Sequence, residues 1–266
     1  MHEVRIIIKQ TGEETEMRLL LTEMHSIRDA LRTMYMSKRT WNWELEEQLK
    51  EMVDHCTDRY GRPLDLPEDD ELKQKFDKDV AKLLKWGQKH ITMLRFEDIS
   101  VVVEGLHRGG TDDLDSHAQR MSNRIIRSST RLADYHEGEV SEWYEDKIIT
   151  WDEVLEYLSM KVPDEISYYG DTYVRANNGF IKKGLENNKD VKRGLYPLAI
   201  PMNFTFKINI TELSHVYVER GSKEGGAHGT AAPELQIMIE DLINQVESWY
   251  PGINRELLLK IASNNV

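Results

Sequence analysis

Short segments with strand character lie among longer segments with helical periodicity, and this mixture limits the folds that the chain can adopt. Residues 96–103 are rich in β-branched side chains, and residues 204–210 alternate between polar and apolar side chains, as half-buried strands do. Residues 4–8 and 17–21 have a similar character and predict a hairpin. The sequence therefore predicts an α+β fold with more helix than strand, in a single domain.

Helices are predicted wherever apolar side chains recur every three or four positions. The glycines and aspartates at 109–113 predict a turn that caps the fourth of these helices. The expected helices cover 23–36, 44–56, a segment that ends at Gly87, 114–130, 151–160, 172–187, 211–220 and 233–249.

The chain is acidic, with 47 Asp and Glu against 35 Lys and Arg and a net charge of −12. A broad nucleic-acid interface needs many basic contacts to phosphates, so the charge argues against nucleic acid as a partner. A small basic pocket for a single nucleotide remains compatible, because net charge does not determine local fields. The only cysteine, Cys56, excludes an internal disulfide, and no surrounding motif marks it as a nucleophile.

Membrane, export and metal-binding signals are weak throughout the sequence. The apolar run at 6–8 is too short for a signal-peptide core, and no run approaches the roughly 18 apolar residues of a membrane span. No CxxC pair occurs, and His215 and His228 have no third ligand at a useful spacing. We therefore expect a cytoplasmic protein without a membrane span and without a bound metal.

One segment of this acidic chain is basic. No acidic residue occurs between Asp115 and Asp134, whereas four arginines do, at spacings of four, three and four. On a helix, this spacing places all four within a sector of roughly 60°. The arginine stripe consists of Arg120, Arg124, Arg127 and Arg131, with the hydroxyl residues Ser128, Ser129 and Thr130 near its end.

Two interpretations of the arginine stripe remain open. Guanidinium forks and hydroxyl groups are the donors that bind a phosphate monoester. Carboxylates three or four positions away, which normally pair with arginines, are missing for Arg120, Arg124 and Arg127. The stripe therefore indicates either an anion site or pairing with acidic residues from elsewhere in the chain.

Several motifs in the carboxy-terminal half follow one another in a characteristic order. Val191-Lys192-Arg193-Gly194-Leu195-Tyr196-Pro197-Leu198 precedes an aromatic strand, Asn209 follows that strand, and Arg220 comes eleven residues after Asn209. This order resembles the V-A-R-x-x-L-P-L and N-A-R-S-L motifs of the flavin-dependent thymidylate synthases, the ThyX family. Phe96-Glu97-Asp98 is similar to the family's F-E-H, and Ser129-Thr130-Arg131 to its S-x-R.

The resemblance covers residues 81–250 of a single domain spanning 1–266, and residues 1–80 diverge from the family pattern. It implies a ThyX-like subunit with mixed helices packed on a mostly antiparallel sheet, in a homotetramer with active sites between subunits. The family binds FAD, dUMP, methylenetetrahydrofolate and NADPH, and produces dTMP. A pyrimidine deoxynucleotide monophosphate and a folate are therefore the expected small-molecule partners.

The resemblance also implies roles for individual residues. Arg220 is expected to be catalytic, because a guanidinium facing the pyrimidine stabilises the negative charge that develops as C5 attacks the one-carbon unit. The expected nucleotide-binding residues are Arg120, Ser128, Ser129, Thr130, Arg131, Arg193 and Arg220, with Ser129, Arg131 and Arg193 on the phosphate. The expected flavin-side residues are Glu97, Arg120, Asn209 and His215.

The chain departs from the family pattern mainly on the flavin side. Gln119-Arg120-Met121 stands where the family has R-H-R, and Thr211 replaces a flavin-side arginine. A hydroxymethylating relative, which acts on dUMP or dCMP and completes the reaction with water rather than hydride, is therefore the first alternative. A nucleotide-binding homologue that has lost catalysis is the second.

Overall fold

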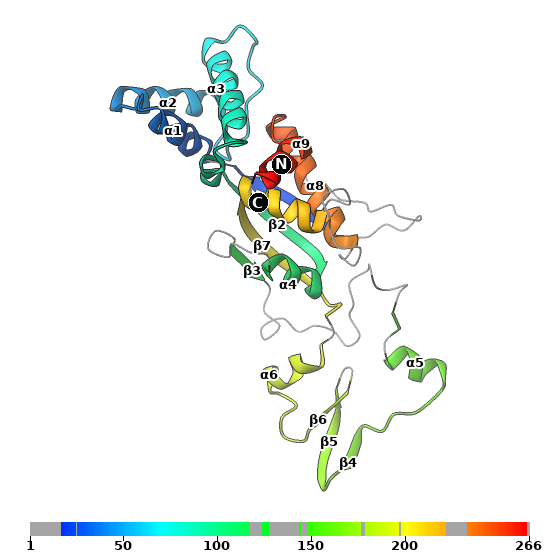
Figure 1. Ribbon diagram of the computed structural model, residues 1–266. Helices are drawn as coiled ribbons and strands as arrows, with labels where there is room; N and C mark the ends of the chain where they lie inside the picture. The colour runs from blue at the N-terminus through cyan, green and yellow to red at the C-terminus, as the bar shows by residue number, and fades with distance from the viewer. Residues whose placement is uncertain are drawn as a thin grey trace.

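A computed structural model describes residues 17–24, 26–116, 124–127, 144, 148–149, 151–176, 179–196, 198–221 and 233–264. These residues form an elongated molecule, with three helices at one end, a four-stranded sheet in the middle and a three-stranded sheet at the other end (Figure 1). Both sheets are antiparallel throughout. The α+β class predicted from the sequence is therefore confirmed.

The middle sheet joins strands that are far apart in the sequence. The expected strands at 17–21, 96–103 and 204–210 are present with boundaries shifted by a few residues, and 4–8 lies outside the described residues. In spatial order the strands are β1 (Arg18–Glu23), β2 (Asp98–His107), β7 (Pro201–Asn209) and β3 (Arg124–Arg127).

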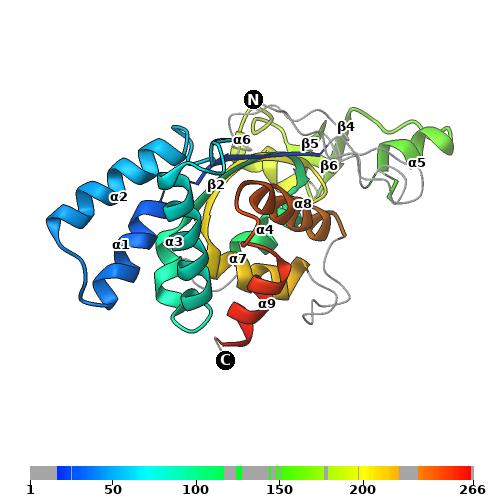
Figure 2. The same cartoon turned by 90° about the horizontal axis from the view of Figure 1, so that it is seen from above.

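One face of the middle sheet is buried and the other is open. Val101 and Phe206 pair in register and are only 0% and 3% exposed, whereas the neighbouring Val102 is 44% exposed. This alternation follows from the two-residue period of a strand. Figure 2 shows the helices gathered on one side of the sheet: α7 (Ile210–Val216), α8 (Pro233–Trp249) and α9 (Arg255–Ser263). The helices expected at 211–220 and 233–249 are confirmed, whereas α9 was not predicted.

Three helices near the amino terminus pack together at one end of the sheet. Asn42 and Asp70 begin two of them, since each side chain accepts a 2.8 Å hydrogen bond from a backbone N–H of the first turn. The predicted end at Gly87 is confirmed, and a Cβ there would lie 2.5 Å from the Leu94 side chain. The helices are α1 (Ile27–Ser37), α2 (Trp43–Cys56) and α3 (Glu71–Gly87).

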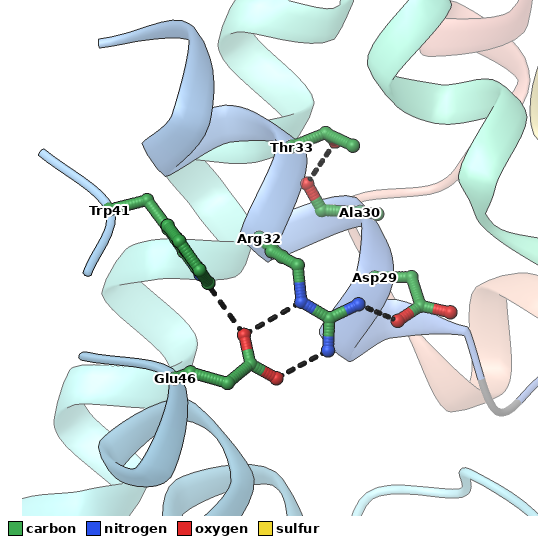
Figure 3. A network of polar contacts seen from close by, with 6 residues as sticks. All are labelled: Asp29, Ala30, Arg32, Thr33, Trp41 and Glu46. Atoms are coloured by element: carbon green, nitrogen blue, oxygen red, sulfur yellow. Dashed lines mark hydrogen bonds and ion pairs between the residues drawn. The ribbon is translucent and has the colours of Figure 1, made fainter. Parts of the chain in front are cut away.

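A polar network connects α1 to α2 (Figure 3). Arg32 donates from Nε to Glu46 Oε2 over 2.7 Å, and its remaining nitrogens bond Glu46 and Asp29. Trp41 Nε1 also donates to Glu46, over 3.1 Å. The hydrogen bond from Arg32 lowers the pKa of Glu46 to about 2, so this carboxylate stays ionised and holds the two helices together.

The helix predicted over 172–187 is wrong. The segment forms strands because Tyr169 and Gly170 both have positive φ, 47° and 84°, which suits a two-residue hairpin turn. That turn pairs the residues on either side of it, and the pairing continues into a third strand. The strands are β4 (Glu165–Tyr168), β5 (Asp171–Ala176) and β6 (Gly179–Lys182), and the expected helix at 151–160 is confirmed as α5 (Trp151–Tyr157).

The helix predicted over 114–130 is correct for residues 114–116, which end α4, but wrong for residues 124–127, which form a strand. The glycines and aspartates at 109–113 lie inside α4 (Arg108–Ser116) rather than in a preceding turn. Residues 124–127 form β3, whose apolar centre pairs with the free edge of β7. Positions 124 and 127 are three apart and so fall on opposite faces of a strand, which excludes the single helical sector predicted for them.

Among the described residues, no helix is long and apolar enough to cross a membrane.

Candidate functional site

The structure places Arg127 of the arginine stripe in a network of carboxylates. Its guanidinium bonds Asp112 and, over 3.0 Å, Asp115, both on α4. For Arg127 the second interpretation of the stripe therefore applies, namely pairing with acidic residues of another element. The remaining nucleotide-side residues of this segment lie outside the described residues: Arg120, Ser128, Ser129, Thr130 and Arg131.

Arg193 lies in a short connection that leads toward β7. It begins the 3₁₀ turn η3 (Arg193–Leu195), directly after α6 (Lys189–Lys192), whose start is capped by Asn188. Its side chain is 45% exposed, and its ion pair with Asp190 is long, at 3.6 Å. The guanidinium is therefore accessible to an anion.

Arg220 lies in an unusual stretch of backbone. The π-helix η4 (Tyr217–Gly221) directly continues α7, and such turns are frequent at functional sites. The turn is tightly packed, because a Cβ on Gly221 would lie 2.7 Å from Ile239 Cγ2 on α8. The Nε of Arg220 is buried and has no hydrogen-bond partner among the described residues. A buried donor of this kind is expected to have an acceptor, so the arrangement favours a bound anionic or carbonyl group.

Glu97 is the most deeply buried acidic residue of the predicted site. It lies between the 3₁₀ helix η1 (Ile91–Phe96) and β2, with an exposure of 0%. Neither carboxyl oxygen has a hydrogen-bond partner among the described residues. Burial, followed by the negative charges of Asp98 and Asp29, raises its pKa well above the usual range, and Lys207 opposes this only in part. Burial therefore favours the neutral, protonated form of this side chain.

Asn209 is enclosed near Glu97. It is the last residue of β7, pairs in register with Asp98, and is 1% exposed. Its side-chain oxygen caps α7 by accepting a 3.0 Å hydrogen bond from Glu212 N. Thr211, at the position of the family's arginine, is fully buried and donates to Ile91 O over 3.1 Å. The structure thus brings Glu97 and Asn209 to one end of the sheet and encloses both.

His215 lies in the last turn of α7 and remains partly exposed. Arg193, in contrast, precedes the opposite end of β7 from Asn209. A nine-residue strand spans roughly 26 Å between its ends, at about 3.3 Å per residue. Asn209 and the start of β7 are therefore separated by the length of the sheet.

A buried pair between His107 and Glu234 was missed by the sequence reasoning. The two side chains are hydrogen-bonded although they are 127 positions apart, and both residues are at most 3% exposed. The sequence holds no signal that links Glu234 to His107.

Two other chemistries find little support among the described residues. No group of three or more His, Cys, Asp and Glu side chains within the described part of the chain could hold a metal ion. Cys56 is buried, and burial raises the pKa of its thiol to about 11. The thiol is therefore protonated at neutral pH and is a poor nucleophile.

Comparison with known proteins identifies the fold. No protein-family model and no curated protein matches the chain. Among solved structures, ThyX from Helicobacter pylori complexed with FAD and dUMP matches with a TM-score of 0.51 and 12% identity, over 90% of this chain and 98% of that one. A second structure of ThyX from the same organism, with FAD and dUMP, gives 0.51 and 13%, over 91% and 99%.

The UMP/dUMP methylase PolB from Streptomyces cacaoi, bound with 5-Br dUMP, matches with a TM-score of 0.50 and 10% identity, over 94% of this chain and 96% of that one. Identities this low support a shared fold and nothing finer. Because nearly the whole of each chain is covered, the match is not restricted to one common substructure. The chain thus has the α+β fold of the flavin-dependent thymidylate synthases.

Proposed function

We propose that this chain transfers a one-carbon unit from methylenetetrahydrofolate to C5 of dUMP, and that reduction through FAD and NADPH then yields dTMP. The observation that carries the proposal is Arg220, whose buried Nε lacks a hydrogen-bond partner among the described residues. It lies in a π-turn at the position that resembles the catalytic arginine of the ThyX family. The solved structures with this fold bind dUMP or 5-Br dUMP, which supports the choice of nucleotide.

The chemistry requires a fixed cation next to the base. When C5 attacks the one-carbon unit, a carbon–carbon bond forms, a bond to a folate nitrogen breaks, and negative charge develops on the ring oxygens. A guanidinium that is already in place stabilises that charge without reorganisation. Packing of Gly221 against Ile239 restricts η4 and so holds Arg220 in place. Arg193, together with Ser129 and Arg131, is proposed to hold the phosphate and thereby to orient the base.

The proposed assembly is a cytoplasmic homotetramer with active sites between subunits. The open face of the middle sheet, which includes the 44%-exposed Val102, is compatible with covering by another subunit.

Two of the described flavin-side residues do not fit a cofactor contact. Glu97 and Asn209 are 0% and 1% exposed, and the oxygen of Asn209 is engaged in capping α7. Neither presents a polar atom at the surface of the chain, so we derive no step through the flavin. This burial favours a second candidate function, the transfer of a hydroxymethyl group to dUMP or dCMP, in which water completes the reaction and no reduction is required.

One assay distinguishes these functions. The protein is incubated with dUMP or dCMP and methylenetetrahydrofolate, with and without NADPH, and the nucleotide product is identified by its mass. A methylated product that requires NADPH supports the first function, and a hydroxymethylated product without NADPH supports the second. Binding of dUMP without any product supports a nucleotide-binding homologue, and the absence of both binding and product contradicts all three. Flavin absorption bands in the purified protein provide an independent measure of FAD.

Substitutions of the three proposed nucleotide-site arginines test their roles in the same assay. Arg220→Gln is expected to lower kcat strongly while dUMP still binds, whereas Arg193→Ala and Arg131→Ala are each expected to weaken dUMP binding. Arg59→Gln is a matched control, because Arg59 is exposed and bonds only the adjacent Tyr60 in the hydrogen bonds of the described residues. Unchanged affinity in both binding variants would remove the phosphate assignment.

A further inference from the structure

A buried histidine–glutamate pair connects two parts of the chain that flank the candidate site. His107 is the last residue of β2, and Glu234 lies in the first turn of α8. The Nδ1 of His107 is hydrogen-bonded to Oε2 of Glu234, and the side chains are 4% and 1% exposed. In the tautomer with a proton on Nδ1, the ring donates and the carboxyl oxygen accepts. A buried pair of this kind is strongly directional, because neither partner has access to water.

The imidazole ring of His107 is enclosed on its other sides. A Cβ on Gly110 would lie 2.9 Å from its Cε1, and a Cβ on Gly109 would lie 3.2 Å from its Cδ2. The ring of Tyr144 meets it edge to face, with centroids 5.0 Å apart. The first turn of α4 therefore contacts the ring through backbone alone, and the position of the ring depends on both α4 and α8.

Helix α8, which carries Glu234, also packs against the turn that carries Arg220. Ile239 lies five positions after Glu234 on α8. Its side chain packs against Gly221 so closely that a Cβ on Gly221 would lie 2.7 Å from Ile239 Cγ2. Gly221 is the neighbour of Arg220 in η4. Because a helix moves nearly as a rigid body over so short a length, a displacement at the start of α8 reaches η4 through this contact.

We propose that His107 and Glu234 are positioning residues, which fix α8 against β2 and α4 and thereby hold Arg220 in its reactive place. Neither residue acts on the nucleotide itself. The effect on turnover rests on the proposed function, whereas the effect on the rigidity of η4 does not. When one partner is removed, the other is left buried without its hydrogen bond, and the local structure opens to hydrate it.

Two substitutions at one position separate the hydrogen bond from the volume of the ring. His107→Phe keeps a ring of similar size but removes the donor, whereas His107→Asn places an amide N–H close to the position of Nδ1. Glu234→Gln tests the partner. Tyr35→Phe is the control, because Tyr35 donates a 2.7 Å hydrogen bond to Asp79, which is 2% exposed and lies on α3, outside both α8 and η4.

Hydrogen exchange measures the rigidity of η4 in the full-length protein. In His107→Phe and Glu234→Gln, amides of 217–221 are expected to exchange about tenfold faster than in the wild type, since losing a charge-assisted buried hydrogen bond shifts local opening by at least that factor. His107→Asn is expected to restore most of the protection, and Tyr35→Phe to leave 217–221 unchanged. Wild-type exchange at 217–221 in both His107→Phe and Glu234→Gln would overturn the proposal.

Kinetics add a second measurement. A misplaced Arg220 weakens only transition-state stabilisation, so kcat and kcat/KM for dUMP are expected to fall together by about tenfold, with KM little changed. A rise in KM at constant kcat would contradict positioning of Arg220. If the wild type does not turn over dUMP, the proposed function fails, and the exchange experiment still decides the positioning role. If Glu234→Gln does not fold, the comparison of His107→Phe with His107→Asn decides in its place.

Discussion

Replacing Glu97 with glutamine should stabilise the protein at neutral pH and remove a pH dependence. Glu97 is 0% exposed, and its carboxyl oxygens have no hydrogen-bond partner among the described residues, so burial raises its pKa and favours the neutral acid in the folded state. In the unfolded chain the carboxyl group ionises near its ordinary pKa of 4.5. Between the unfolded and folded pKa values, the folded state therefore binds more protons than the unfolded state.

The sign and size of the effect follow from linkage. The part of the unfolding free energy that is linked to Glu97 is fully present below pH 4.5. It is lost as the pH rises toward the raised pKa of the folded state, at up to about 1.4 kcal/mol per pH unit. From pH 4.5 to pH 7 this loss has an upper limit of about 3 kcal/mol. Glutamine has nearly the same shape and does not titrate. Glu97→Gln should therefore match the wild type near pH 4.5 and exceed it by up to about 3 kcal/mol at pH 7.

The assay is urea unfolding at constant ionic strength, at several pH values between 4.5 and 8, for the wild type and the variant. Only the difference between the two curves reports on Glu97, because the other carboxyl groups titrate equally in both proteins. Glu46→Gln is the control with the opposite sign, since Arg32 lowers the pKa of Glu46 to about 2. The stability that Glu46 contributes is lost only as the pH falls from 4.5 toward 2, so between pH 4.5 and 8 Glu46→Gln should be less stable than the wild type by a nearly constant amount.

Two results would refute this reasoning about Glu97. The first is a Glu97→Gln variant that is less stable than the wild type at pH 7, which would mean that the carboxylate is ionised and paired with a cation. The second is a stability difference that does not change with pH, which would mean that the carboxyl group titrates alike in the folded and unfolded states.

Three further predictions concern other parts of the chain. Arg127→Gln should destabilise the protein, with a smaller additional effect in the double variant with Asp112→Asn, because the two side chains are paired; unfolding by urea measures the coupling. Gly221→Ala should lower kcat without weakening dUMP binding, because its Cβ would meet Ile239 at 2.7 Å and displace η4; steady-state kinetics and calorimetry test this. Cys56 should not react with a thiol reagent at pH 7 until the protein unfolds, because its thiol is buried and its pKa is about 11.

The sequence predicted the elements whose signals are local. Helices α2, α3 and α8 have clear apolar periodicity, and Asn42 and Asp70 mark the first residues of two of them through side-chain caps. The positions of β2 and β7 followed from β-branched and alternating residues in the same way. These signals depend only on neighbours along the chain, so one sequence is enough to read them.

The incorrect predictions concern segments whose structure depends on distant partners. Residues 124–127 have helical spacing of arginines, but they pair with β7, roughly 80 positions further along the chain. The backbone hydrogen bonds to β7 stabilise residues 124–127 as a strand by more than their intrinsic propensity favours a helix. The burial of Glu97 depends similarly on the packing of η1, β2 and residues such as Tyr250, whose pKa is raised by burial and by the nearby Glu97. No local pattern reports such an arrangement.

The charge of the candidate site is therefore distributed differently from the predicted stripe. Arg127 is neutralised by two aspartates of α4, whereas Arg193 is 45% exposed and Arg220 has a buried nitrogen without a hydrogen-bond partner in the described part of the chain. A cation that already has carboxylate partners contributes little to binding an anion, because those partners must first be displaced. Binding of the nucleotide should consequently depend more on Arg193 than on Arg127, and turnover should depend on Arg220. A comparison of Arg127→Gln with Arg131→Ala and Arg193→Ala in dUMP binding tests this arrangement, since a uniform helical stripe would give Arg127 an effect equal to that of Arg131.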